Sequence, residues 1–161
     1  MFISKSVNGA ITYPDRLNYT NYLFRVSQKA IIFNEKGQVL VVKETGRDWW
    51  DIPGGGIDHG ESIKDALARE LKEEVSLKGD FKYEAIIVED PRYQEKANLY
   101  QMRIIYLVTP DNLNFEPGED GDEIVFINPL DFKDSKIITE QKIYEYSQLA
   151  DKHYKLIRDY F

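Results

Sequence analysis

The chain contains no cysteine, so neither a disulfide nor thiolate chemistry can contribute to its fold or its function. It also has no apolar run close to the roughly 20 residues that a membrane-spanning helix needs. The N-terminal residues lack the basic and apolar regions of a signal peptide. These absences fit a cytoplasmic protein with no membrane partner, and we predict that location.

Positive charge is in short supply. The 161 residues include 21 Lys and Arg against 28 Asp and Glu, a formal net charge of −7. Such a balance argues against a nucleic-acid polymer as the partner. A small phosphate compound remains a suitable partner if a divalent metal ion supplies the positive charge.

The length and composition indicate one folded domain. The chain is 42% hydrophobic and 13% aromatic, which is typical of a globular protein with a sizeable core. We therefore predict a single domain over residues 1–161. Residues 1–22 are an N-terminal extension whose aromatic residues have no clear periodicity, and they form either a strand and loop packed on the domain or part of a homodimer contact.

The order of apolar runs and turns predicts an α+β fold with mixed β-sheet and helices on the outside. The first two runs, 23–33 and 38–43, flank a turn at 34–37 and predict a β-hairpin. After a helix come strands near 81–89, 99–108 and 123–127, which are separated by polar loops at 90–98 and 110–122. Apolar residues at helical spacing predict a C-terminal helix over 139–161.

The segment that follows the glycine-rich turn at 54–56 predicts a helix over about 62–75. Ser62 is a favourable N-cap, and Asp65 stands where a capping box has its acid. Strong helix formers then continue without Gly or Pro. One apolar stripe faces the core: Ile63, Leu67, Leu71 and Val75.

Three glutamates, Glu70, Glu73 and Glu74, lie on one flank of this helix at i, i+3 and i+4. Carboxylates this close repel one another, whereas oxygen-rich clusters bind Mg²⁺ or Mn²⁺ well. The glycines before the helix allow the backbone to approach such a site closely. The alternative interpretation is an ordinary solvated helix face, and it is the weaker one because Glu61 and Arg69 stand in register with the cluster.

This stretch resembles the box of the Nudix hydrolases. The pattern runs from Gly55 through Glu61 and the segment 69–74 to Leu77. It departs from the family only at Ser76, where the family has glycine, and we expect altered geometry at this helix end without loss of activity. The resemblance implies a Nudix-type α/β/α sandwich whose catalytic helix follows a glycine-rich loop.

The resemblance also implies an activity and its residues. Nudix enzymes cleave a phosphoanhydride bond in a nucleoside diphosphate linked to another group, such as a nucleoside triphosphate, with Mg²⁺ or Mn²⁺. It implies metal ligands at Glu70, Glu73 and Glu74 and at the Gly54 carbonyl. Glu70 is also a candidate general base, and Glu61 and Arg69 take catalytic supporting roles as an ion pair.

Family members often add an acidic residue from a later loop. The sequence offers several such candidates, of which Glu119 and Glu123 have the better position, just before the last strand. The others are Glu95, Glu116 and Asp120.

The substrate-binding residues are harder to predict. Arg47 and Trp49 lie in a polar loop and are candidates to face the substrate, whereas Trp50 is expected to pack in the core. Tyr93 is a candidate to stack on a base. By resemblance to subfamilies of the Nudix hydrolases, Pro91 implies ADP-ribose and Tyr93 implies dinucleoside polyphosphates as the substrate, so these two indications cancel.

Two other functions use the same fold. One is a non-catalytic domain that senses or regulates through nucleotide binding, although lineages of that kind usually lose glutamates that this chain retains. The other is an isomerase of a diphosphate compound, which is weaker because its extra catalytic residues are not found. The hydrolase is the leading hypothesis.

Overall fold

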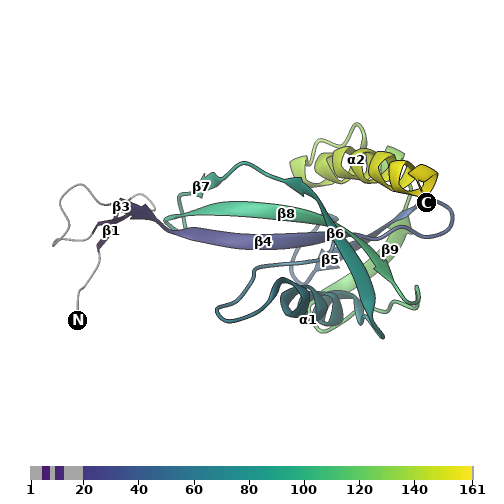
Figure 1. Cartoon of the computed structure of the whole chain (residues 1–161), viewed down its shortest axis with the longest axis horizontal. Coiled ribbons are helices and arrows are strands. Elements are labelled where there is room, and N and C mark those ends of the chain that lie inside the picture. The colour runs from purple at the N-terminus through teal and green to yellow at the C-terminus, as the bar shows by residue number, and fades with distance from the viewer. Residues whose placement is uncertain (1–4, 8–9, 13–19, 161) are drawn as a thin grey trace.

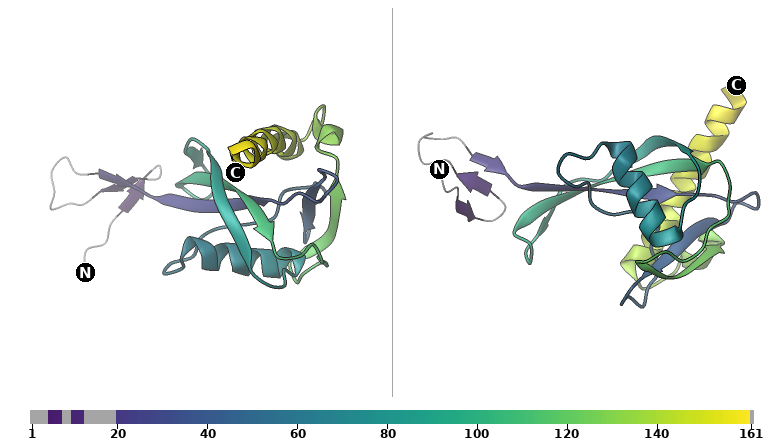
Figure 2. Two further views of the ribbon diagram at one scale, coloured as in Figure 1. Left: turned by 45° about the vertical axis from the view of Figure 1, so that its right-hand side comes forward. Right: turned by 90° about the horizontal axis from the view of Figure 1, so that it is seen from below.

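The computed structural model of the chain describes residues 5–7, 10–12 and 20–160. The central strands, which follow Tyr22, lie between two helices on opposite sides (Figures 1 and 2), which confirms the predicted α+β sandwich. The elements are β1 (Lys5–Val7), β2 (Ala10–Thr12), β3 (Thr20–Tyr22), β4 (Phe24–Ile31), β5 (Val39–Glu44), α1 (Ile63–Val75), β6 (Phe81–Val88), β7 (Arg92–Gln94), β8 (Leu99–Pro110), β9 (Gly121–Ile127), the 3₁₀ turn η1 (Pro129–Phe132) and α2 (Ile138–Tyr160).

The main sheet has the order β4-β8-β6, with β4 parallel and β6 antiparallel to β8. The short strand β7 also pairs with β8. Strands β5 and β9 form a separate antiparallel pair. The sheets are therefore mixed, as predicted. None of the helices that the structure describes is long and apolar enough to cross a membrane.

The core lies on both faces of the main sheet. On one side, Ala30 and Ile32 pack with the α1 residues Leu67 and Leu71. On the other, Ile31 packs in a second cluster that includes Ile143 of α2. Because successive residues of a strand point to opposite faces, the continuous apolar run at the end of β4 supplies both clusters.

The predicted β-hairpin is wrong, because the two strands pair with each other only next to the turn. Asn34 donates its N–H to the Gln38 carbonyl at 3.0 Å, and only the bridge between Phe33 and Val39 follows it. Strand β4 then pairs with β8, and β5 pairs with β9. Both runs are buried on two faces, so they have no alternation of polar and apolar residues that would identify their partners.

Two segments differ from the predicted loops and extension. The polar loop 90–98 contains β7, which turns back on β8 with Asn98 at a positive φ of 50°. Strands β1, β2 and β3 form an antiparallel sheet that projects beyond the N-terminal end of β4 (Figure 1). The rest of the predicted extension, 1–4, 8–9 and 13–19, lies outside the described residues, and the dimer contact stays a prediction.

Helix α1 begins and ends with local hydrogen bonds. The Ser62 hydroxyl accepts the Asp65 N–H at 3.1 Å, as the capping pattern predicts. At the other end Ser76 takes the left-handed conformation, with φ 52° and ψ 42°. The Leu77 N–H then reaches the Leu71 carbonyl at 3.1 Å, as in a glycine-terminated helix. The expected alteration of this helix end is therefore not observed, because serine adopts the conformation that glycine would take.

Replacing Ser76 with glycine is expected to raise the free energy of unfolding by about 0.5–1 kcal/mol. Glycine has no steric penalty in the left-handed conformation, which costs other residues about 1–2 kcal/mol. Part of this gain is lost because glycine also raises the conformational entropy of the unfolded chain. Urea unfolding measures the change. A destabilised Ser76→Gly variant would show that the hydrogen bond from Ser76 Oγ to the Pro117 carbonyl, at 3.3 Å, outweighs the backbone term.

Candidate active site

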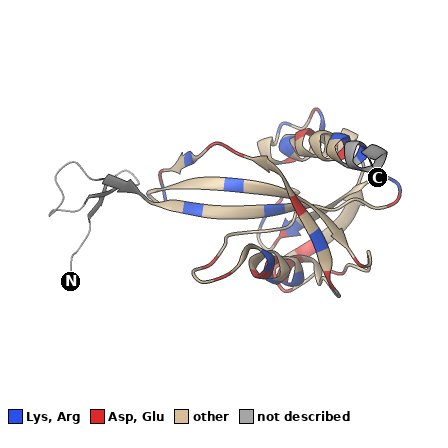
Figure 3. Cartoon of the chain, viewed as in Figure 1, with Lys and Arg blue, Asp and Glu red and all other residues tan. Residues whose placement is uncertain are grey.

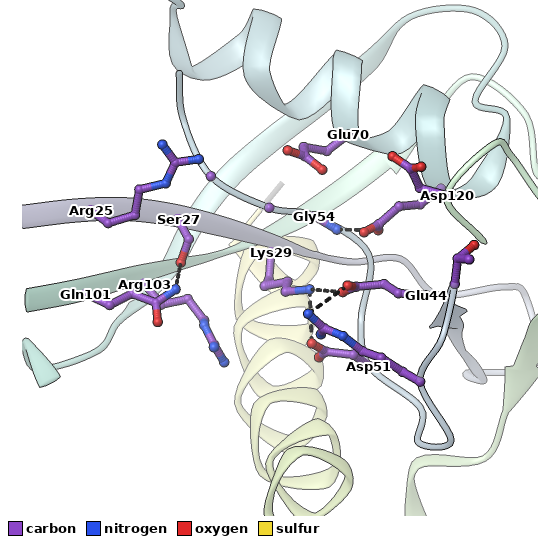
Figure 4. Close-up of a pocket in the computed structure, with 15 residues that line it drawn as sticks. Arg25, Ser27, Lys29, Glu44, Asp51, Gly54, Glu70, Gln101, Arg103 and Asp120 are labelled. Atoms are coloured by element: carbon purple, nitrogen blue, oxygen red, sulfur yellow. Dashed lines mark hydrogen bonds and ion pairs between the residues drawn. The ribbon is translucent and has the colours of Figure 1, made fainter. Parts of the chain in front are cut away.

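A polar cleft of about 380 Å³ opens between α1, the glycine-rich loop and one end of the main sheet (Figure 4). Charged residues of both signs form most of its lining. The lining residues are Arg25, Ser27, Lys29, Glu44, Thr45, Arg47, Asp51, Gly54, Gly55, Gly56, Glu70, Glu74, Gln101, Arg103 and Asp120.

The sheet contributes its residues through the period of two. Arg25, Ser27 and Lys29 alternate along β4 and face the cleft, as do Gln101 and Arg103 on β8. The parallel register places Arg25 beside Gln101, and the Gln101 amide donates to Ser27 Oγ at 3.2 Å. Sequence reasoning did not select the β4 residues; their alternating polar positions, just before a fully apolar run, were the available signal.

The glycine-rich loop is attached to the free edge of β4. The Gln28 N–H donates to the Gly55 carbonyl at 2.8 Å, and the Ile57 N–H donates to the Val26 carbonyl at 3.0 Å. A Cβ on Gly54, whose φ is +129°, would lie 2.3 Å from the Gln28 carbonyl oxygen. Glycine is therefore required for the loop to run this close to the strand.

Glu70 and Glu74, one turn apart on α1, form the acidic wall of the cleft. Glu70 lies so close to Gly55 that an added Cβ would meet its carboxylate oxygens at 2.5–2.6 Å. Glu74 is buried, and it accepts the Gly54 N–H at 2.8 Å. The loop and the helix thus fix both carboxylates at one side of the cleft.

Electrostatics differ between the two walls. Burial raises the pKa of Glu74 to about 8, although Lys29 and the Gly54 N–H oppose the shift. Burial alone would lower the pKa of Lys29, but Asp51, Glu74 and Glu44 outweigh it and raise the pKa overall. Lys29 Nζ lies 3.0 Å from Asp51 Oδ2 and 3.5 Å from Glu44 Oε1. The ammonium group of Lys29 therefore does not by itself offset the burial that raises the pKa of Glu74.

Without divalent metal, the free energy of unfolding is expected to fall between about pH 5 and pH 9. The folded protein keeps the Glu74 proton up to a pKa of about 8, whereas the model value for an unfolded glutamate is 4.5. The stabilisation is complete below the unfolded value and is lost as the pH rises through the folded one, with a total on the order of a few kcal/mol. Urea unfolding in EDTA at pH 5, 7 and 9 measures this slope.

Glu74→Gln is the matched control for that slope. The amide oxygen can still accept the Gly54 N–H, but the side chain no longer titrates. The pH dependence of the variant should be flatter than that of the wild type, and equal slopes would contradict the assignment. Mg²⁺ should stabilise the wild type more at pH 9 than at pH 6, because ligands must lose their protons.

Arg69 connects the helix to the glycine-rich loop. Its guanidinium donates to Glu61 Oε1 at 2.7 Å and to Oε2 at 2.9 Å, which is the predicted ion pair. It also donates to the Gly56 carbonyl at 3.0 Å and to Glu70 Oε1 at 2.7 Å. Hydrogen bonds from Arg69 and from the Asp58 N–H lower the pKa of Glu61 to about 2, so Glu61 stays ionised. Arg69 therefore stays paired with Glu61 while it also holds the Glu70 carboxylate in place.

The remaining predicted acids lie outside the cleft. Glu73 accepts a hydrogen bond from Arg69 at 3.4 Å and borders a neighbouring hollow together with Glu119. Glu123 pairs with Lys43 at 3.4 Å. Asp120, which the sequence placed second to these two, lines the cleft instead.

Glycines explain this choice of acid. A Cβ on Gly118 would lie 2.0 Å from the Glu73 carbonyl oxygen, and one on Gly121 would lie 2.2 Å from that of Glu74. The loop therefore rests directly on the C-terminal carbonyls of α1, and the Asp120 N–H donates to the Glu73 carbonyl at 2.9 Å. Close packing of the backbone leaves no pattern in the sequence of acidic residues, so the sequence could not single out Asp120.

Of the predicted substrate-binding residues, only Arg47 lines the cleft. Its guanidinium pairs with Glu44 at 3.0 Å and lies 5.6 Å from the centre of the Trp49 ring, which is outside the lining. Tyr93, on β7, packs against Tyr100 and donates its hydroxyl proton to Asn98 at 2.7 Å. Substrate contacts of Trp49 and Tyr93 stay predictions.

The donor set of the cleft fits a hard divalent cation. Its acidic wall offers only oxygen ligands, from Glu70, Glu74 and the adjacent backbone, and the buried Glu74 carboxyl needs positive charge to ionise. No three His, Cys, Asp or Glu residues within the described ranges are grouped to hold a metal ion. Mg²⁺ commonly binds through one or two carboxylates and the substrate phosphates rather than in a complete protein cage. The residues present therefore fit Mg²⁺ or Mn²⁺.

Comparisons with known proteins place the chain in a family. The family model described as NUDIX domain matches residues 23–158. The chain is 43% identical over 70 residues to an RNA pyrophosphohydrolase of Ruthia magnifica subsp. Calyptogena magnifica, covering 44% of this chain and 38% of the relative. It is 52% identical over 54 residues to one from Psychrobacter sp. (strain PRwf-1), covering 34% and 31%. The matches thus span less than two fifths of these curated relatives.

A solved structure supports the fold. The MutT protein from Methanosarcina mazei Go1 superposes with a TM-score of 0.62, covering 81% of this chain and 96% of that one. The two sequences are 19% identical, so the likeness bears on the arrangement of strands and helices alone.

Proposed function

Because this chain belongs to the Nudix family, we propose that it is a divalent-metal-dependent hydrolase that cleaves a phosphoanhydride bond in a nucleoside diphosphate linked to another group. The observation that carries the proposal is the cleft itself. Two helix carboxylates, Glu70 and Glu74, line it together with basic side chains from β4 and β8. That arrangement suits a phosphate chain that is held between metal and cations.

Basic residues of the sheet reach the cleft, whose lining holds four basic residues and five acidic ones. Figure 3 shows basic positions along β4 and β8, and Arg25, Lys29 and Arg103 on these strands line the cleft. A guanidinium group can donate two hydrogen bonds to two oxygens of one phosphate. The ammonium group of Lys29 is a point charge, and Asp51 and Glu44 hold it in place. These groups would orient the phosphates and stabilise the negative charge of the transition state.

The reaction we propose is attack of water on one phosphorus of the diphosphate. A bound divalent ion would neutralise the phosphates and acidify the attacking water. Glu70, which faces the cleft and is held by Arg69, accepts the proton of that water as the general base. Glu61 keeps Arg69 in position, so its role and that of Arg69 are to orient Glu70.

Other parts of the prediction remain proposals of the same kind. We retain Glu73 and the Gly54 carbonyl as additional metal ligands, and Asp120 is the later acid that we now favour over Glu119 and Glu123. The names of the relatives indicate RNA as their substrate. For this chain we propose a small nucleotide, because its net charge of −7 disfavours a polyanionic polymer. A cytoplasmic location and a homodimer also remain proposals.

The test is chromatographic separation of the nucleotide and phosphate products formed from nucleoside triphosphates, ADP-ribose, dinucleoside polyphosphates and nucleotide sugars. We expect turnover of at least one class with Mg²⁺ or Mn²⁺ and none with EDTA. No turnover by the folded protein would contradict the hydrolase. Thermal stabilisation by a nucleotide without turnover would favour the sensing domain instead.

A further inference from the structure

A second hollow of about 130 Å³ lies next to the cleft, at the start of α2 and beside β7 and β8. Its residues come from segments that are far apart in the sequence. They are Glu89, Arg92, Gln94, Gln101, Arg103, Ile138, Thr139 and Lys142. We call it the second hollow.

Positive charge exceeds negative charge in the second hollow. Arg92, Arg103 and Lys142 line it together with one acid, Glu89. Lys142 Nζ takes one oxygen of Glu89 at 2.6 Å, and Arg103 Nε lies 3.8 Å from the other. The Glu89 side chain is only 13% exposed and that of Lys142 17%, so solvent screens these charges weakly. Two positive charges are left without a neutralising carboxylate.

Hydrogen-bond donors that lack an acceptor also indicate that the second hollow binds an anion. Arg103 Nε is buried and makes no hydrogen bond within the described structure. The side chain of Arg92 has no hydrogen bond or ion pair to any residue in the described ranges. A buried donor without an acceptor is costly. An anion that accepts a hydrogen bond from Arg103 Nε would remove this cost, and the exposed guanidinium of Arg92 can bind the same anion.

The lining identifies the kind of anion. No aromatic side chain lines the second hollow, so it offers no surface on which a base could stack. Residues at the first turn of α2, Ile138 and Thr139, lie in its wall, and the positive end of a helix dipole favours negative charge. The guanidinium group of an arginine can donate two parallel hydrogen bonds to two oxygens of one phosphoryl group. These properties suit one phosphoryl group.

The second hollow is continuous with the active-site cleft in its lining. Gln101 and Arg103 border both spaces, and Figure 4 shows Arg103 across the cleft from Glu70. A ligand whose diphosphate lies at Glu70 can therefore extend past Arg103 without leaving the protein surface.

We propose that the second hollow binds a further phosphoryl group of the substrate whose diphosphate lies in the cleft. The inference rests on the proposed function, because it takes the cleft as the diphosphate site. The preferred substrate then has one phosphoryl group more than the cleft itself holds. That group lies either on the ribose or at the far end of a longer phosphate chain.

Binding measurements by calorimetry with Mg²⁺ test the proposal and separate the two sources. The first pair of ligands is the ADP analogue in which a methylene group replaces the bridging oxygen and the same analogue with an added 3′-phosphate. The second pair is the ADP and ATP analogues in which methylene groups replace the bridging oxygens, so that they resist cleavage. In each pair the ligands differ by one phosphoryl group, and at least one pair should show a gain of about tenfold or more in affinity with the wild type.

The variants are Arg92→Gln and Lys142→Gln, since both residues line the second hollow and neither lines the cleft. Lys152→Gln, at an exposed position on the same helix, is the matched control. Each hollow variant should reduce the gain to about threefold or less, whereas the control should retain it. Arg92 is exposed, so its variant keeps the test valid even if Lys142→Gln folds poorly.

A gain confined to the pair that differs by the 3′-phosphate assigns the ribose, and one confined to the pair of ADP and ATP analogues assigns the phosphate chain. The proposal is overturned if no ligand binds, if neither pair shows a gain, or if the gain survives in both hollow variants. The measurement reports binding and not turnover. A protein that shows the gain but cleaves nothing would therefore disprove the hydrolase and leave the second hollow as a phosphoryl site.

Discussion

Replacing Glu70 with glutamine is expected to lower kcat by about 10³-fold. The carboxylate faces the cleft and lies against Gly55. Loss of one preorganised charged group at the reacting centre has effects of this size. The amide oxygen can still accept the 2.7 Å hydrogen bond from Arg69, so the fold should remain intact. Steady-state kinetics on the best substrate, with thermal unfolding alongside, measure both effects.

The control for this experiment is Glu145→Gln, which makes the same chemical change at an exposed position on α2. Its kcat should equal that of the wild type. A Glu70→Gln enzyme with more than about a tenth of the wild-type kcat would remove Glu70 from the catalytic centre. If Glu70→Gln does not fold, the kcat of Glu70→Asp is measured instead, because aspartate keeps the charge but has a shorter side chain.

Arg69→Ala is expected to have the second large effect, with kcat lower by about 10²-fold and the free energy of unfolding lower by about 2 kcal/mol. Arg69 connects α1 to Glu61 and to the Gly56 carbonyl, and its side chain is 29% exposed. Hydrogen bonds between charged groups contribute on this scale. A catalytic group displaced by about 1 Å can lose about 10²-fold in rate. Kinetics and urea unfolding test the two parts separately.

Arg69→Lys and Lys72→Ala sharpen the interpretation. Lysine retains the charge but cannot form the two-pronged contact with Glu61, so it should restore less than half of the lost stability. Lys72 is an exposed basic residue of the same helix, and its loss should change neither quantity. Full activity in Arg69→Ala would show that the loop holds its place without this contact.

The parts of the structure that follow from local signals were predictable. Helix α1 and its Ser62 cap depend on residues within a few positions of one another, and the Arg69–Glu61 pair lies within one motif. The class of the fold follows from the order of these elements. Partner choice among strands is different: β4 joins β8, some seventy residues away, and no local pattern specifies that pairing.

The cleft shows the same limit. Lys29 has no motif around it, and only the parallel pairing of β4 and the course of the glycine-rich loop bring it near Glu74. Asp120 enters the cleft because Gly118 and Gly121 rest on the end of α1. The acidic composition of that loop could narrow the candidates to a few neighbours but could not choose among them.

Hydrolysis in ¹⁸O-labelled water, followed by mass spectrometry of the products, tests most directly whether this cleft directs water onto a phosphoanhydride. With Mg²⁺ and the best substrate, we expect one ¹⁸O atom in one phosphate-containing product for each bond cleaved, and label transfer about 10³-fold slower with Glu70→Gln. Products that form without the label would mean that the phosphoryl group passes to another acceptor. That result, or a cleavage rate that is the same in Glu70→Gln, would contradict the account.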